Sequence, residues 1–127
     1  MSHYRDKVVL VTGGASGIGR ALGTALAARG ARLVLVDINA DGLEAAGAAI
    51  ASDGGRVRWR VLDVTDRHAV RAVVDDIYAT EGPLDYLFNN AGVCLFGDTH
   101  EMTPAQWDRL LAVNLHGVVH GIEAVYP

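Results

Sequence analysis

The chain has 127 residues, half of them hydrophobic, and a formal net charge of −4. This length suits one domain with a substantial core, and the charge gives no electrostatic reason to expect nucleic acid or an anionic membrane as a partner. The single cysteine, Cys94, allows no internal disulfide framework, and no apolar run approaches the roughly 18 to 20 residues that span a bilayer. Because residues 1–7 lack a secretory signal pattern, we expect a cytoplasmic protein.

The first predicted strand leads directly into a glycine-rich turn and a helix. Residues 7–12 form a largely apolar run of strand length. Over residues 17–29, apolar residues recur at helical spacing and are expected to face the core: Ile18, Leu22, Ala25 and Leu26. Gly13, Gly17 and Gly19 remove Cβ atoms where the backbone must turn sharply and approach a ligand. The free amide groups at the start of the helix would face an anion there. This order predicts a site for nucleotide phosphates; an ordinary turn of small residues is the alternative.

The second predicted strand, residues 32–37, ends in an acid. Asp37 lies 18 residues beyond Gly19, where a carboxylate accepts hydrogen bonds from both hydroxyls of an adenosine ribose in dinucleotide-binding folds. The same carboxylate repels a 2′-phosphate, and no arginine follows it directly, so the sequence favours NAD over NADP. A loop acid without a ligand is the alternative.

Two predicted helices come after the second and third strands. Asn39 is expected to cap the first of them and Thr65 the second, because short polar side chains bond the free amides of a first turn. Helical spacing places the following apolar residues toward the core: Leu43, Ala46, Ile50, Val70, Val73, Val74 and Ile77.

The third predicted strand, residues 56–62, alternates charged and bulky residues with a period of two. This pattern is typical of a strand with one wet face, and charged side chains suit a sheet edge because they discourage pairing with other chains. A phosphate or RNA patch formed by its arginines is the alternative interpretation.

The fourth predicted strand, residues 84–88, precedes a loop and a last helix. Residues 103–106 form a capping box with proline at the first helical position. The helix runs nearly to residue 127 and carries an apolar stripe: Trp107, Leu110, Leu111, Leu115, Val118 and Ile122. Strands thus alternate with helices four times, which predicts a doubly wound α/β fold with a parallel sheet and helices on both faces.

Four short motifs occur in order along the chain. Residues 12–19 read TGGASGIG, Asp63-Val64 follows the third strand, residues 89–92 read NNAG, and Asn114 stands in the last helix. This set resembles the TGxxxGxG segment, the adenine-contacting acid, the NNAG segment and the catalytic asparagine of the short-chain dehydrogenase/reductase family.

The resemblance implies a Rossmann sheet with strand order 3-2-1-4 and a nicotinamide cofactor at the carboxyl ends of its strands. In that family Asp63 would accept a hydrogen bond from the adenine amino group, and the NNAG backbone would run toward the nicotinamide. The implied cofactor-binding residues are Thr12, Gly13, Ser16, Gly17, Ile18, Gly19, Asp37, Ile38, Asp63, Val64, Asn90, Ala91, Gly92 and Val113.

Asn114 is a polar residue at an apolar position, and this can be seen without the family resemblance. It lies seven residues after Trp107, on the apolar stripe. We therefore expect a buried amide, which needs partners because an unsatisfied one costs about 1–3 kcal/mol. An asparagine bonded to backbone is one interpretation. The resemblance implies the other, a catalytic residue that holds a water in a proton relay.

One family feature is absent from this sequence. The resemblance implies a catalytic tyrosine, a lysine four residues later and an upstream serine, but the 127 residues contain no Tyr-x-x-x-Lys, and Lys7 is the single lysine. The apolar fourth strand would also have nothing to pair with on its outer side. We therefore expect residues 1–127 to be the NAD-binding half of a domain about twice as long, and to be inactive alone.

The expected function is hydride transfer between NAD and a small alcohol or carbonyl substrate, in an enzyme that forms a homodimer or homotetramer. A non-catalytic NAD-binding or redox-sensing module is the alternative, and a truncated product that pairs through its last helix is a third.

His116, His120 and Glu123 share one helical face at a spacing that can bind zinc. No further ligand is evident, so we expect no metal site there. We expect Cys94 to be buried as a small hydrophobic residue, with a place in the substrate cavity as the alternative.

Overall fold

In the computed structural model, which describes residues 3–126, four parallel strands form one sheet in the order β3-β2-β1-β4. The strands are β1 (Val8–Thr12), β2 (Arg32–Asp37), β3 (Arg56–Val61) and β4 (Tyr86–Phe88). The order confirms the prediction of 3-2-1-4. The fourth strand is shorter than predicted, because residues 84 and 85 lie outside the ladder.

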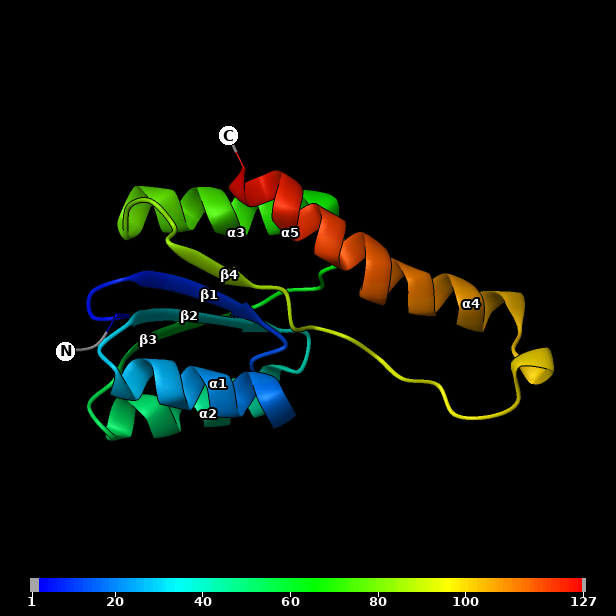
Figure 1. Cartoon of the computed structure of the whole chain (residues 1–127), viewed down its shortest axis with the longest axis horizontal. Coiled ribbons are helices and arrows are strands. Elements are labelled where there is room, and N and C mark those ends of the chain that lie inside the picture. The colour runs from blue at the N-terminus through cyan, green and yellow to red at the C-terminus, as the bar shows by residue number, and fades with distance from the viewer. Residues whose placement is uncertain (1–2, 127) are drawn as a thin grey trace.

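Helices cover both faces of the sheet, as Figure 1 shows. Helices α1 (Gly17–Ala28) and α2 (Ala40–Ser52) lie on one face, and α3 (Arg67–Thr80) and α5 (Gly117–Val125) lie on the other. This confirms the doubly wound arrangement, in which the order of successive strands reverses between β1 and β4, at the topological switch point.

The core consists of two apolar layers that share the central strands. Val9 and Val11 of β1 pack with the α1–α2 layer, whereas Val8 and Leu10 pack with the α3–α5 layer. Successive side chains of a strand point to opposite faces, so a strand covered on both sides must be apolar throughout. The predicted inward positions of α2 and α3 are all buried. No helix within residues 3–126 is both long and apolar enough to cross a membrane.

Two predicted helix caps are confirmed and one is wrong. The Asn39 side chain accepts a hydrogen bond from the Gly42 amide at 3.1 Å, and Thr103 forms the predicted capping box. Helix α3, however, is capped by Asp66, which accepts from the Ala69 amide at 3.0 Å. Thr65 is not available for this role, because its hydroxyl donates to the carboxylate two residues before it.

Strand β3 lies at an edge of the sheet with its arginines exposed, as predicted, and side chains on both of its faces also contact helices. On one face Arg58 pairs with Asp76 at 2.8 Å and with Glu81 at 3.2 Å. On the other face the Trp59 ring covers Gly47 of α2, where a Cβ would lie 2.2 Å from the ring. The arginine side chain at position 58 is therefore engaged with carboxylates, which argues against a phosphate or RNA patch.

The last helical segment differs from the uniform helix that the sequence predicts. Helix α4 (Pro104–Leu111) continues through one π-helical turn (Ala112–His116) into α5. Helix α4 extends beyond the sheet (Figure 1), and the buried residues of the whole helical segment, as far as the structure describes it, lie outside the predicted stripe: Val113, Gly117, Gly121 and Ala124. Four stripe residues are between 41% and 52% exposed: Trp107, Leu111, Leu115 and Ile122.

Candidate functional site

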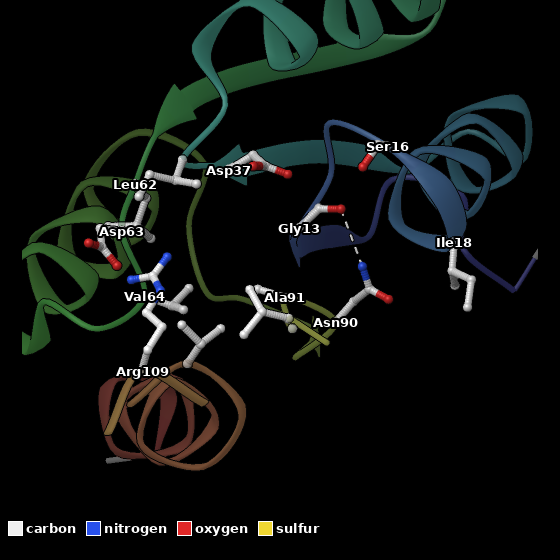
Figure 2. A pocket seen from close by; sticks show the side chains of 14 residues that line it. Gly13, Ser16, Ile18, Asp37, Leu62, Asp63, Val64, Asn90, Ala91 and Arg109 are labelled. Atoms are coloured by element: carbon white, nitrogen blue, oxygen red, sulfur yellow. Dashed lines mark hydrogen bonds between the residues drawn. The ribbon is translucent and has the colours of Figure 1, made fainter. Parts of the chain in front are cut away.

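A cleft of about 330 Å³ lies at the carboxyl ends of the strands, beside the switch between β1 and β4. Such a crevice is where ligands bind in open α/β sheets. Figure 2 shows the side chains that line it. The lining residues are Gly13, Ser16, Ile18, Asp37, Ile38, Leu62, Asp63, Val64, Asn90, Ala91, Gly92, Val93, Arg109 and Val113.

The glycine-rich turn has the backbone that the sequence predicts. Gly13 and Gly17 have φ angles of +68° and +56°, in the left-handed region where a Cβ is strained. At Gly19 the requirement is close approach, because a Cβ there would lie 2.0 Å from the Gly13 carbonyl oxygen. Ile18 points away from the core and is 79% exposed, so its predicted place in the apolar stripe of α1 is wrong. It lies at the cleft instead.

Thr12 and Asn90 fasten this turn to the end of β4. The Thr12 hydroxyl oxygen accepts hydrogen bonds from the amides of Asn90 and Ala91, both at 3.0 Å. In return, the Asn90 side-chain amide donates to the carbonyls of Thr12 at 3.1 Å and Gly13 at 3.3 Å (Figure 2). Each buried polar atom of this junction is thereby satisfied, and the turn is held in one shape.

Asp37 is held rigidly at the end of β2. One carboxylate oxygen accepts from the Ala15 amide at 3.0 Å and the other from the Asn39 amide at 2.9 Å. The carboxylate thus joins the glycine-rich turn to the start of α2. Each oxygen keeps lone pairs for further donors on the cleft side.

Asp63 lies at the other end of the cleft, just after β3. One of its oxygens accepts from the Thr65 amide at 2.9 Å and from the Thr65 hydroxyl at 2.7 Å. These two hydrogen bonds lower the pKa of Asp63, and the positive charge of Arg109 lowers it further. The side chain is therefore an ionised, acceptor-only group at neutral pH.

Asn114 lies within the π-helical turn and is exposed, which corrects the expectation of a buried amide. Its Oδ1 accepts from the Val93 amide at 2.8 Å, and its Nδ2 donates to the Val93 carbonyl at 2.9 Å. The backbone-bonded interpretation describes this geometry, because both amide atoms hold the segment after Gly92 against the helix. The catalytic role implied by the resemblance stays a prediction.

Three lining residues were not predicted from the sequence: Leu62, Val93 and Arg109. Arg109 had a detectable signal, since it precedes Val113 by four residues and so lies on the same helix face. Leu62 and Val93 are neighbours of predicted residues and add apolar surface to the cleft walls.

The other candidate groups of the sequence do not form sites. The His120 ring nitrogen Nδ1 lies 2.8 Å from the Val64 carbonyl, and Glu123 pairs with Arg67, so the zinc interpretation has no support. Cys94 is exposed, which corrects its expected burial.

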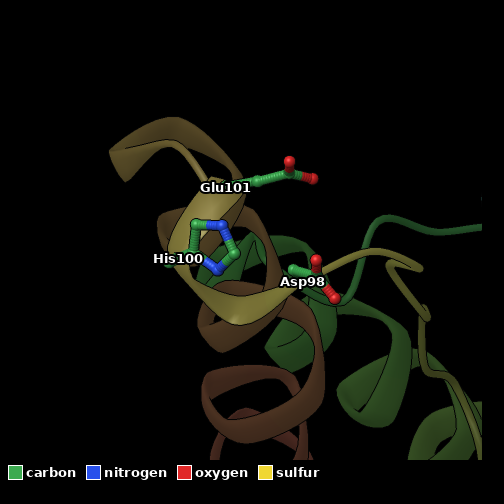
Figure 3. A group of neighbouring side chains, drawn as sticks. All are labelled: Asp98, His100 and Glu101. Carbon is green, nitrogen blue, oxygen red and sulfur yellow. The ribbon is translucent and has the colours of Figure 1, made fainter.

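Asp98, His100 and Glu101 bring three ligand atoms within 4.8 Å of one another before α4 (Figure 3). All three residues are exposed. Exposed acidic groups commonly gather in this way without an ion, so the cluster is no more than a surface feature.

A sequence profile described as short chain dehydrogenase matches residues 7–127. The chain belongs to the short-chain dehydrogenase family. Within this family, D-threitol dehydrogenase of Mycolicibacterium smegmatis is 44% identical over 119 residues, which make up 94% of this chain and 46% of that protein. The predicted family is thus confirmed, and family members are oxidoreductases.

Solved structures of the family have the same fold. A structure of NAD+-bound xylitol dehydrogenase matches with a TM-score of 0.92 at 36% identity, over 98% of this chain and 48% of that one. A metagenomic short-chain oxidoreductase in complex with NADP matches with a TM-score of 0.91 at 37% identity, over 97% and 56%. The chain spans about half the length of these family members. Because both nicotinamide cofactors occur among them, family membership alone does not select NAD or NADP.

Proposed function

We propose that residues 1–127 are the cofactor-binding half of an NAD-dependent short-chain oxidoreductase that acts on a small alcohol or carbonyl substrate. The observation that carries the proposal is the turn between β1 and α1. A Cβ at Gly13 would meet Ala91 at 2.9 Å and a Cβ at Gly19 would meet Gly13, so the backbone is packed against itself and only hydrogen fits. The turn leads into α1, whose N-cap Ser16 makes no side-chain cap hydrogen bond, so this side chain leaves the first-turn amides open to the pyrophosphate of a dinucleotide.

The remaining lining residues fit the other parts of the cofactor. Asp37 would bind the adenosine ribose, and Asp63 with the Val64 backbone would bind the adenine. The segment Asn90 to Gly92 would pass toward the nicotinamide, where small residues let the backbone come close. When bound, the nicotinamide supplies or accepts the hydride, while this chain binds, orients and shields the cofactor.

Asp37 is the basis for preferring NAD. Its two oxygens are fixed by the Ala15 and Asn39 amides, so the carboxylate cannot easily turn away from a 2′-phosphate. A rigid negative charge beside a phosphate is repulsive in a partly desolvated cleft.

A second candidate is a module that binds NAD without turnover. The 127 residues contain no Tyr-x-x-x-Lys, so they do not distinguish this module from a catalytic enzyme. Residues 1–127 alone are expected to bind cofactor and to give no turnover. A catalytic enzyme, in contrast, needs an acid/base tyrosine from the rest of its chain. The exposed apolar residues of α4, such as Trp107 and Leu111, support a homodimer or homotetramer.

The test uses the full-length protein and the fluorescence of NADH and NADPH on titration. Hydrogen bonds to a charged group contribute about 1.5–3 kcal/mol, so Asp37→Ala is expected to raise the Kd for NADH about 10- to 100-fold. Asp37→Asn is expected to bind NADPH more tightly relative to NADH, because the repulsive charge is gone. Asp41→Asn removes an acid of the first turn of α2 outside the cleft and serves as the control.

Three outcomes would contradict parts of this proposal. Equal affinity of the unaltered protein for NADH and NADPH would overturn the preference for NAD. An unchanged Kd in Asp37→Ala would overturn the assigned ribose site. Binding of neither cofactor would overturn the proposed function as a whole.

A further inference from the structure

Arg109 reaches the cleft from a helix that carries none of the glycine, acid or NNAG segments. It lies in α4, one turn before Val113, and both residues line the cleft. Figure 2 shows its side chain rising from this helix toward Asp63 and Val64. The guanidinium therefore stands at the end of the cleft that the proposed function assigns to the adenine, and the inference rests on that proposed function.

The positive charge of Arg109 distinguishes it from the other residues that line the cleft. Among the described residues that line the cleft, two are carboxylates, Asp37 and Asp63, and Arg109 is the sole cation. Its charge acts on the Asp63 carboxylate. Arg109 thus places a positive charge at the end of the cleft where Asp63 is proposed to accept a hydrogen bond from the adenine.

The hydrogen-bond donors of the Arg109 guanidinium are also unused within the described residues. Over residues 3–126 the Arg109 side chain makes no hydrogen bond or ion pair, whereas Arg58 bonds Thr80, Asp76 and Glu81 at the sheet edge. An arginine held in a surface ion-pair network would have its donors occupied. The donors and flat face of Arg109 are left for a ligand or solvent.

The neighbouring walls of the cleft suit a flat apolar ring. Leu62, Val64 and Val113 line the same cleft as Arg109 and are each at most 9% exposed, so they form apolar wall there. A planar guanidinium is attracted to the face of an aromatic ring and is less strongly hydrated than an ammonium group. A base bound between these groups would have apolar contacts on its faces and the Asp63 acceptor at its edge.

We propose that Arg109 is a specificity-determining residue for the base of the cofactor. Its guanidinium covers the adenine, while Asp63 remains free to accept from the adenine amino group. Arg109 then contributes to binding of the adenosine half of the dinucleotide and not to binding of the nicotinamide half.

The experiment compares two competitors that carry one phosphate each, AMP and nicotinamide mononucleotide, by displacement of NADH from the full-length protein. Arg109→Met keeps the aliphatic stem and removes the charged plane, so the Kd for AMP is expected to rise about 2- to 30-fold. The Kd for nicotinamide mononucleotide is expected to stay unchanged. Arg109→Lys keeps the charge without the plane and is expected to lose less affinity, again for AMP alone. Arg20→Met removes an exposed arginine of α1 outside the cleft and is the matched control.

Two results would overturn the role of Arg109. If both competitors weaken equally, the side chain acts on phosphate or on overall charge and not on the base. If AMP binds the Arg109→Met protein as tightly as the unaltered protein, the guanidinium does not contact the adenine. Should Arg109→Met fail to fold, Arg109→Lys decides the question by the same comparison. Failure of the unaltered protein to bind NADH or NADPH would instead refute the proposed function.

Discussion

Gly19→Ala tests how the glycine-rich turn is built. A Cβ at this position would lie 2.0 Å from the Gly13 carbonyl oxygen and 2.5 Å from the Asn90 side-chain nitrogen. Real Cβ atoms do not approach other heavy atoms below 3.0 Å, so the turn must move away from α1 by about 1 Å or more. Such a movement also breaks the hydrogen bond between Asn90 and the Gly13 carbonyl.

The size of the effect follows from these two losses. Overpacking of a well-packed site costs about 1–3 kcal/mol. A polar group that loses its hydrogen bond costs about another 1–3 kcal/mol. We therefore expect Gly19→Ala to lower the free energy of unfolding by about 2–6 kcal/mol, and to weaken NADH binding because the amide groups no longer converge.

Urea unfolding of the full-length protein measures the loss of stability, and NADH fluorescence measures the loss of binding. Gly17→Ala is the matched control, because no atom lies within 4 Å of its Cβ position and the cost is confined to its φ angle of +56°. Left-handed backbone costs a residue with a Cβ about 1–2 kcal/mol. A Gly19→Ala protein that loses no more stability than Gly17→Ala would refute the steric reasoning.

Asp66→Ala removes the observed cap of α3 and is expected to lower the free energy of unfolding by about 1 kcal/mol by urea titration; an Asp66→Ala protein as stable as the unaltered protein would contradict the assigned cap. Asp63→Asn tests the pH dependence. Because hydrogen bonds from Thr65 lower the pKa of Asp63 in the folded protein, its ionised form stabilises the fold above about pH 4, and this contribution is lost as the pH falls through the folded-state value. The Asp63→Asn protein should therefore lose less stability between pH 5 and about pH 3 than the unaltered protein, and parallel pH profiles would count against this.

Local sequence patterns were sufficient for the order of elements and for the first part of the site. The apolar run of β1, the glycines after it and the acid at the end of β2 each depend on backbone geometry close in sequence. The register Thr12 with Val36 then brings Asp37 beside the turn. Residues such as Asp37 were therefore predictable from their spacing alone.

Contacts between remote elements were less predictable. Thr65 and Asp66 are both good capping residues, and the choice between them depends on whether the Thr65 hydroxyl is occupied by Asp63. Asn114 has a spacing that predicts burial with the apolar stripe, but the π-helical turn buries Val113 instead, and Asn114 is exposed. Arg109 lines the cleft because of where α4 lies in the fold, and no local sequence pattern specifies the position of that helix.

The junction between Thr12 and Asn90 has a consequence for folding. These residues are separated by 78 positions, and their hydrogen bonds close a loop that contains β2, β3, β4 and three helices. Non-local contacts of this kind form only after the entropy of a long loop closure has been overcome. A peptide of residues 8–29 would contain every glycine of the turn but neither Asn90 nor Ala91 to fix its shape. Under the proposed function, affinity for the dinucleotide would therefore report that distant parts of the chain are in contact, because the glycine motif by itself does not fix the shape of the turn.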